Sequence, residues 1–345
     1  MLAPRVLRVS IKVSIIGGGG RVGSSAAFAL QCAGIVREIH ILDADEKSSE
    51  GEALDLMHGT SCAADQLIYS GSYDCCADTD VVIVSAGSRR KPDESRLDLM
   101  SRNLDLFRQI LDSLRAAPLR SDAIVFVVSN PVDILTHLAI DHLRLDPTRV
   151  IGLGTQLDTA RFRSLIAQET GLPASQVKAL ILGEHGDSMV PVWSGATVAG
   201  VSLLKLAGFT AAVQQRVVDR TRGAGAEAIR LKGGAGWAVG LTIAEVVHAI
   251  ALNQHKLLPV STQLAGEYGI RETCTSVPTL IGRAGVIKRL EIELWPRELS
   301  ALRSGAKQLD ATYAQVRELE RGMGVSPEHL PLQRHALGGG TPKSR

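Results

Sequence analysis

A glycine-rich segment near the N-terminus has the spacing of a phosphate-binding loop. Residues 17–23 read GGGGRVG, follow a short apolar run and precede a helical segment. Glycines let the backbone approach a pyrophosphate, whose charge then meets free amide groups at the helix N-terminus. The residues expected to contact a dinucleotide here are Gly18, Gly20, Arg21, Val22 and Gly23. The spare Gly17 also permits a G-x-x-G-x-x-G register, so both registers stay open, as does a tight turn without a ligand.

A carboxylate follows the next predicted strand at the spacing that ribose recognition needs. Asp43 lies at the end of that strand, twenty residues after Gly23, where it can accept hydrogen bonds from the adenosine ribose hydroxyls. A 2′-phosphate would be repelled there by Asp43 and the nearby Asp45, since no basic residue lies between them. The pattern therefore favours NAD over NADP. The alternative is that Asp43 is only a turn residue after a strand.

Polar side chains gather in four further segments at expected turns. These are SRRKPDESR at 88–96, SNP at 129–131, LDTAR at 157–161 and GEHGDSM at 183–189. The carboxyl ends of parallel strands form the ligand crevice of an open α/β sheet, so the first two segments are natural ligand contacts. Each segment alone also has an ordinary explanation: Asp158 and Arg161 could be a plain helix pair, and a lone histidine such as His185 is commonly structural.

The elements that must position these residues alternate between strand and helix. Short β-branched runs lie at 13–16, 39–42, 81–84, 124–128 and 150–151, and segments of helical length lie at 24–33 and 97–114. This alternation predicts a parallel sheet with right-handed crossovers, and the continuous apolar runs fit strands covered on both faces. The fold class is therefore α/β, a Rossmann-type doubly wound parallel sheet followed by a mixed α+β substrate domain.

The pattern changes after about Gly154. Longer helical segments at 157–170 and 211–229 mix with an alternating strand at 286–294. We therefore predict an NAD-binding Rossmann domain at 1–152, a substrate domain at 153–324 and a flexible C-terminal tail at 325–345.

Composition excludes several classes of protein. The 345 residues carry a net charge of +2 without a long block of one sign, so we expect neither a nucleic-acid partner nor a membrane surface. Apolar runs such as 123–128 are far shorter than the roughly 20 residues that span a bilayer. The apolar stretch 13–16 meets glycines too early for an export signal. The five cysteines form no zinc motif, so we expect reduced thiols, no metal and a cytoplasmic location.

Six segments together resemble the malate/lactate dehydrogenase family. They are GGGGRVGSS at 17–25, EGEALDLMHG at 50–59, RKPDESRLDL at 90–99, SNPVD at 129–133, LGTQLDTARFR at 153–163 and GEHGDSMVP at 183–191. The likeness runs from about residue 9 to about residue 321, and looks closest to NAD-dependent malate-type members of the lactate-dehydrogenase-like plan. It implies an NAD-dependent 2-hydroxy acid dehydrogenase that forms a homodimer or homotetramer, with the helix around 52–57 at a subunit contact.

The resemblance also implies a role for each site residue. His185 is the proton donor and acceptor, and Asp158 orients its imidazole; because a carboxylate favours the charged ring, we predict a raised pKa for His185. Arg161 holds the C1 carboxylate of the substrate through parallel donors. Arg96 polarises the reacting carbonyl, and Asn130 hydrogen-bonds substrate near the nicotinamide. The further residues implied to contact the cofactor are Ala86, Gly87, Asn103, Val128 and Asn130.

One loop residue is used to choose the substrate. In this family the residue six before the carbonyl-polarising arginine separates malate-type from lactate-type members, and counting back from Arg96 reaches Arg90. A cation fits a second carboxylate, and beside pyruvate it would be enclosed without a partner. Ala235, near a position where lactate-type members carry Thr, leaves room for a diacid. We therefore predict a malate dehydrogenase of the tricarboxylic acid cycle, acting on a small dicarboxylate.

Three other interpretations are weighed against this one. The first is an L-lactate dehydrogenase, acting on pyruvate and lactate. The second is an NAD-dependent glycosidase of the same fold, which needs a metal-binding Cys/His arrangement that we do not find in the sequence. The third is a non-catalytic NAD-binding module, which would have no reason to retain His185, Asp158, Arg161 and Arg96 together.

Overall fold

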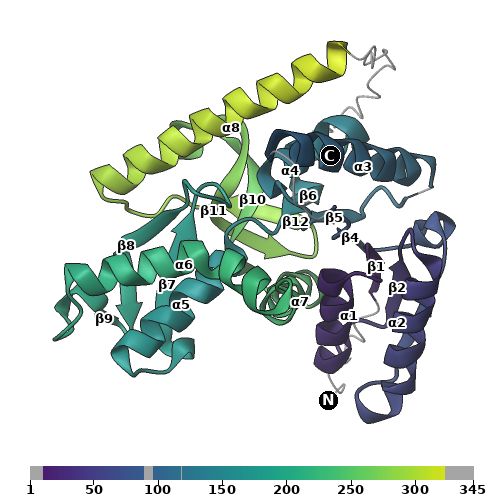
Figure 1. Cartoon of the computed structure of the whole chain (residues 1–345), viewed down its shortest axis with the longest axis horizontal. Coiled ribbons are helices and arrows are strands. Elements are labelled where there is room, and N and C mark those ends of the chain that lie inside the picture. Colours follow the sequence, from purple (N-terminus) through teal and green to yellow (C-terminus); the bar gives the residue numbers. More distant parts are fainter. Residues whose placement is uncertain (1–10, 89–95, 118, 323–345) are drawn as a thin grey trace, which may run out of the picture.

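The computed structural model describes residues 11–88, 96–117 and 119–322, and for residues 96–98 and 319–322 it describes the backbone alone. Within these residues a nine-stranded sheet runs in the order β12-β11-β10-β6-β5-β4-β1-β2-β3 (Figure 1). Its first six strands are β1 (Lys12–Ile16), β2 (Glu38–Leu42), β3 (Leu67–Ser70), β4 (Val81–Val84), β5 (Ile124–Val127) and β6 (Val150–Gly152). All six pair in parallel, in the strand order of a doubly wound sheet that binds dinucleotides at its carboxyl edge.

Helices cover both faces of this parallel part, which explains why its strands are apolar along their length. The helices are α1 (Arg21–Ala33), α2 (Glu46–His58), α3 (Arg96–Ala116), α4 (Val132–Leu143), α7 (Trp237–Ala251) and α8 (Pro296–Gly322). Ile15 and Ile41 pack with α1, α2 and α7 on one face. Their neighbours Ile16 and Leu42 pack with α3, α4 and α8 on the other face. The loops at the carboxyl edge are therefore held between two cores.

The second half of the chain extends the same sheet and adds another. Antiparallel strands β10 (Lys256–Ala265), β11 (Arg271–Gly282) and β12 (Gly285–Arg289) continue the large sheet, and β10 meets β6 where Ser261 pairs with Gly152. Three strands form a smaller sheet: β7 (Val177–Leu182), β8 (Val190–Val198) and β9 (Val201–Ser202). Helices α5 (Gln156–Thr170) and α6 (Ala211–Lys232) pack on it around Phe162 and Trp193. The predicted fold class is confirmed.

Short 3-10 helices complete the described elements. They are Thr60–Cys62, Tyr73–Cys76, Pro147–Arg149, Ala174–Gln176, Leu203–Lys205 and Glu267–Gly269. In the described part of the chain, no helix is both long enough and apolar enough to cross a bilayer. The division at residue 152 stays a prediction, and the predicted tail at 325–345 lies outside the described residues.

One predicted strand is wrong over half its length. The alternating segment 286–294 pairs with β11 only as far as Arg289. The next residue, Leu290, still donates its backbone N–H to the carbonyl oxygen of Pro278 at 2.8 Å. Because proline has no N–H group, Pro278 cannot return the bond. The chain then leaves the sheet, and Ile292 donates its backbone N–H to the hydroxyl of Tyr268 instead, at 2.8 Å.

Candidate active site

The glycine-rich loop joins β1 to α1 and is packed too closely for side chains. Gly17 has a φ of +84°, in the left-handed region that favours glycine, and a Cβ on it would lie 2.4 Å from the backbone nitrogen of Ala86. A Cβ on Gly18 would lie 2.5 Å from Cγ2 of Ile41. A Cβ on Gly23 would lie 2.3 Å from the carbonyl oxygen of Gly17. Packing therefore requires both Gly17 and Gly18, the first glycines of the two predicted registers. It does not show which register binds the cofactor.

The start of α1 and the end of β2 together fit an NAD molecule. The residue that caps α1 is Gly20, which has no side chain to accept hydrogen bonds from the first-turn N–H groups. Asp43 lies beside the loop, where its Oδ2 accepts from the backbone N–H of Gly19 at 3.1 Å and its Oδ1 accepts from that of Asp45 at 3.1 Å. Free helix amides suit a pyrophosphate, and an adjacent carboxylate suits ribose hydroxyls.

Hydrogen bonds join three predicted contact segments at the carboxyl edge of the sheet. Asn103 on α3 accepts from the backbone N–H of Ser88 at 2.8 Å and donates to the carbonyl oxygen of Asn130 at 3.3 Å. Ser129 donates to the carbonyl oxygen of Ala86. Two further predicted residues differ in their surroundings: a Cβ on Gly87 would meet no atom within 4 Å, whereas Val128 is buried. Their contacts with the cofactor stay predictions.

Arg21 reaches away from the glycine loop toward the connection between α6 and α7. Its guanidinium donates to the carbonyl oxygen of Gly234 at 3.0 Å and to that of Lys232. Ala235, which the sequence analysis linked to substrate size, follows in the same connection and is half-buried. Val22 packs against the core on the α1 face of the sheet. The structure therefore gives Arg21 and Val22 structural contacts, and their predicted contacts with NAD stay untested.

The predicted proton donor, its carboxylate partner and an arginine form one cluster. Asp158 and Arg161 lie one turn apart at the start of α5, and His185 lies on the loop after β7. The Nδ1 atom of His185 is 2.6 Å from Oδ2 of Asp158, and a guanidinium nitrogen of Arg161 is 3.3 Å from Oδ1. Asp158 is 1% exposed, whereas His185 is 23% exposed and Arg161 is 17% exposed. A buried carboxylate thus holds two side chains that solvent still reaches.

This arrangement favours the charged imidazole. Burial alone would lower the pKa of His185, but the charge and hydrogen bond of Asp158 outweigh it, and the pKa lies above the ordinary 6.5. The predicted direction of the shift is therefore confirmed. A ring that carries its proton near neutral pH is suited to proton transfer.

A second buried carboxylate, Asp133, contacts His185 and was not predicted as a site residue. Its Oδ2 accepts from the backbone N–H of His185 at 2.8 Å, and Asp133 is 3% exposed. Burial raises the pKa of Asp133 to about 6. Its sequence signal is weak, because an acidic residue in the first turn of a helix ordinarily serves the helix dipole.

Two predicted substrate-contacting residues cannot be placed. Arg90 lies outside the described residues, and so does the side chain of Arg96, although the backbone of Arg96 begins α3. The roles given to them by the resemblance, selection of the substrate by Arg90 and polarisation of the carbonyl by Arg96, stay predictions about residues that the structure does not describe.

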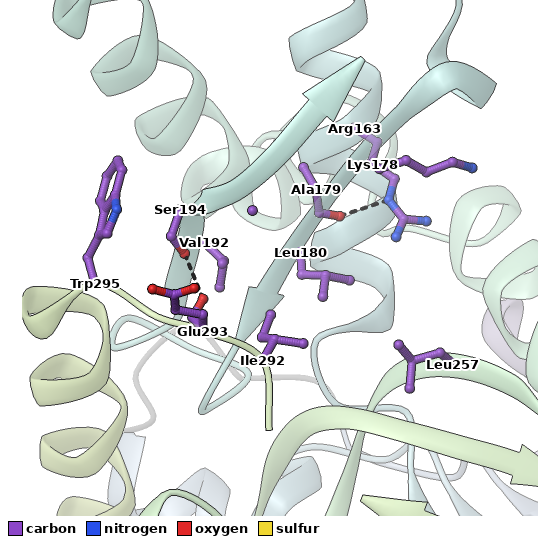
Figure 2. A pocket seen from close by; sticks show the side chains of 11 residues that line it. Arg163, Lys178, Ala179, Leu180, Val192, Ser194, Leu257, Ile292, Glu293 and Trp295 are labelled. Atoms are coloured by element: carbon purple, nitrogen blue, oxygen red, sulfur yellow. Dashed lines mark hydrogen bonds between the residues drawn. The ribbon is translucent and has the colours of Figure 1, made fainter. Parts of the chain in front are cut away.

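A pocket of about 540 Å³ lies beside the small sheet (Figure 2). Arg163 lies at this pocket and donates to the carbonyl oxygen of Ala179 at 2.9 Å, while Ser194 donates to that of Glu293 at 3.2 Å. None of the described residues predicted for catalysis or cofactor binding lines it. The candidate active site is therefore the cluster around His185 and not this pocket.

Comparison with family models agrees with the fold and the cluster. A model for the lactate/malate dehydrogenase NAD binding domain matches residues 11–152, and a model for the lactate/malate dehydrogenase alpha/beta C-terminal domain matches residues 155–320. The chain therefore belongs to the lactate/malate dehydrogenase family. It is an NAD-dependent 2-hydroxy acid dehydrogenase, and the predicted cofactor is confirmed.

Individual relatives carry the name of one branch of this family. The chain is 40% identical over 313 residues to an L-lactate dehydrogenase of Bifidobacterium animalis subsp. lactis, covering 88% of this chain and 96% of that protein. It is 36% identical over 307 residues to an L-lactate dehydrogenase of Acetivibrio thermocellus, covering 88% and 96%. The crystal structure of a minor L-lactate dehydrogenase from Enterococcus mundtii matches with a TM-score of 0.86 and 35% identity, covering 89% of this chain and 99% of that one.

These relatives correct the predicted substrate. The prediction of malate dehydrogenase, with a dicarboxylate substrate and a place in the tricarboxylic acid cycle, is wrong. It rested on the charge of one side chain, Arg90, and on the small size of Ala235. A single cation can be neutralised by a neighbouring carboxylate, and Asp93 and Glu94 follow Arg90 closely in the sequence. The likeness to the relatives instead extends over most of the chain.

Proposed function

We propose that the chain is an L-lactate dehydrogenase, which interconverts pyruvate and (S)-lactate with NADH and NAD. The observation that carries the chemistry is the 2.6 Å contact between Nδ1 of His185 and Oδ2 of Asp158, with Arg161 on the other oxygen of the same carboxylate. The choice of pyruvate over other 2-oxo acids is supported by the names of the relatives.

Each residue of the cluster has a task in the reduction of pyruvate. When bound, NADH supplies the hydride that adds to C2 of the 2-oxo acid. The carbonyl oxygen then needs a proton, which the protonated His185 donates from Nε2 because its Nδ1 faces Asp158. Asp158 holds the ring in one orientation and stabilises its charged form. In lactate oxidation the same nitrogen accepts the proton from the C2 hydroxyl.

Arg161 is suited to hold the substrate carboxylate. One of its nitrogens contacts Asp158, and a guanidinium has further donors in a planar fork that matches a carboxylate. A Cβ on Gly225 of α6 would lie 3.9 Å from both terminal nitrogens of Arg161, so this glycine leaves space beside the guanidinium. A carboxylate held there would place C2 of pyruvate near His185.

Exposed apolar side chains support a homo-oligomer. Large fractions of Phe28 on α1, Leu54 and Met57 on α2, and Trp237 and Leu241 on α7 are exposed. Side chains of this kind are typical of subunit interfaces. We propose a homodimer or homotetramer that uses this surface; the cytoplasmic location stays a prediction.

Initial rates on a grid of two substrates and two cofactors test the proposal. We expect kcat/KM for pyruvate with NADH to exceed that for oxaloacetate, and NADPH to support little turnover. The matched control is His185→Gln, which removes the proton donor and should reduce turnover of both acids. A higher kcat/KM for oxaloacetate than for pyruvate would overturn the proposal, as would an unaffected His185→Gln variant.

A further inference from the structure

We propose that Asp133 is a positioning residue that anchors the loop bearing His185 and stabilises the protonated imidazole through its own negative charge. The inference rests on the proposed function, because it assumes that His185 transfers a proton. It adds a second carboxylate to the pair formed by His185 and Asp158.

The two carboxylates hold different parts of His185. Asp133, in the first turn of α4, accepts from the backbone N–H of His185 at 2.8 Å. Asp158, in the first turn of α5, contacts the ring at 2.6 Å. With the main chain fixed by one helix and the imidazole fixed by another, the ring has little freedom to move away from a bound substrate.

The burial of Asp133 indicates that its charge matters. A neutral amide could accept the backbone N–H of His185 equally well, and an ionised carboxylate is costly to bury unless a cation compensates. Asp133 is 3% exposed, and within the described residues its Oδ1 has no hydrogen-bond partner. The hydroxyl of Ser261 on β10 lies near enough to favour the charged form of Asp133. Within the described residues, however, this hydroxyl also has no hydrogen-bond partner. The compensating charge is the imidazolium of His185.

The other charged groups near this pair decide the direction of the effect. Asp158 favours the protonated form of His185 more than Asp133 does, and Arg161 opposes it. Glu184, next to His185, disfavours the ionised form of Asp133. Cys274 on β11 is also close, and the charge of Asp133 keeps the pKa of its thiol raised beyond the effect of burial. With a pKa of about 6, Asp133 is mainly ionised at neutral pH, so removing its charge should lower the pKa of His185.

Asp133 also lies at the helix start that carries a predicted substrate contact. Asn130 precedes α4 by two residues, and its backbone oxygen accepts from Asn103 of α3. The first turn of α4 therefore connects the carboxyl end of β5 with the loop that carries His185. A shift of this turn would move both Asn130 and His185.

The test compares two substitutions that separate the hydrogen bond from the charge. Asp133→Asn keeps an oxygen that can accept the backbone N–H of His185 but removes the charge, whereas Asp133→Ala removes both. Asp141→Asn, at an exposed position of the same helix, is the matched control. The pKa of His185 is measured by NMR of ring-labelled histidine in the NAD-bound protein, and kcat/KM for pyruvate is measured across pH with NADH.

We expect Asp133→Asn to lower the pKa of His185 by about one unit and to shift the alkaline fall in pyruvate reduction by the same amount. Asp133→Ala should add a loss of kcat at every pH, and Asp141→Asn should match the parent protein. An unchanged pKa in Asp133→Asn overturns the proposal. If Asp133→Asn does not unfold cooperatively, the pKa of His185 is measured in Asp133→Ala, which also lacks the charge and should also lower this pKa. An unchanged pKa in that variant overturns the proposal. The NMR titration needs no turnover, so a shifted pKa without pyruvate reduction would reject the proposed function and retain the role of Asp133.

Discussion

The ring nitrogen Nδ1 of His185 lies 2.6 Å from Oδ2 of Asp158, a carboxylate that is 1% exposed. Because the ring is 23% exposed while its partner is buried, solvent and substrate can reach the imidazole but not the charge that stabilises it. A contact of this kind fixes the tautomer and the orientation of histidine together.

Asp158→Asn should therefore lower kcat for pyruvate reduction by about 100-fold or more. The amide keeps the size of the side chain but removes the charge that favours the imidazolium. Steady-state rates measure the loss, and NADH binding followed by fluorescence is the control, since the glycine loop joins β1 to α1 and Asp158 lies on α5. A loss of less than tenfold would show that the carboxylate contributes little.

The two directions of the reaction should depend on pH with opposite sign. Reduction of pyruvate needs the protonated imidazole, and the pKa of His185 lies above 6.5. The kcat/KM for pyruvate should therefore stay constant as pH rises through 6.5 and fall only above the raised pKa. The kcat/KM for lactate should rise with pH up to the same raised pKa and stay constant above it, because oxidation needs the neutral ring. Profiles that fall together with rising pH would contradict this assignment of the proton.

Arg161→Lys should weaken substrate binding without removing the positive charge. A lysine is a point charge and cannot offer two parallel donors to a carboxylate. We expect KM for pyruvate to rise at least about tenfold, with the affinity for NADH unchanged. The matched control is Arg216→Lys. The exposed Arg216 forms an ion pair with Glu169, so the kinetic constants of this variant should equal those of the parent protein. Equal KM values for the two variants would exclude a binding role for Arg161.

Asp43→Ser should reduce the preference for NADH over NADPH. The carboxylate accepts backbone N–H groups at 3.1 Å on both oxygens, and it is predicted to accept hydrogen bonds from the adenosine ribose. Without its charge, a 2′-phosphate is repelled less, and the ratio of kcat/KM for NADPH to that for NADH should increase by about tenfold or more. Asp55→Ser, farther along α2, controls for a general change in charge. A ratio equal to that of the control would mean that Asp43 does not select the cofactor.

The sequence predicted the parallel strands well because burial on both faces leaves continuous apolar runs such as 81–84. It did not predict α7, whose apolar residues surround most of the helix and include the exposed Trp237 and Leu241, so no one-sided pattern marks it. The predicted strand 286–294 ran past Arg289, because the residue that ends the pairing, Pro278, lies on the neighbouring strand β11.

The site shows the same division between local and long-range information. His185, Asp158 and Arg161 were predicted because their segments resemble those of the malate/lactate dehydrogenase family, and the structure brings them together. Asp133 was missed because its contact with His185 joins residues 52 positions apart. The substrate was mispredicted because the prediction relied on the charge of one residue, Arg90, and the sequence does not show whether that charge is free to meet a substrate.

Gly23→Ala should damage the cofactor loop while leaving the catalytic cluster intact. The added Cβ would lie 2.3 Å from the carbonyl oxygen of Gly17 and 2.7 Å from Cα of Gly18, and backbone atoms on both sides cannot move aside as a flexible side chain can. Either α1 shifts away from β1 or the loop opens, so the free energy of unfolding should fall by about 1–3 kcal/mol. The affinity for NADH should weaken by at least about tenfold, because the amides predicted to bind the pyrophosphate move with α1. The control is Gly51→Ala on α2, where a Cβ would meet no atom within 4 Å, and where alanine should stabilise the helix by about 0.5–1 kcal/mol. Denaturant unfolding and NADH titration of both variants separate the two effects. If Gly23→Ala bound NADH as tightly as Gly51→Ala does, the close approach of helix and loop would not be needed for the cofactor.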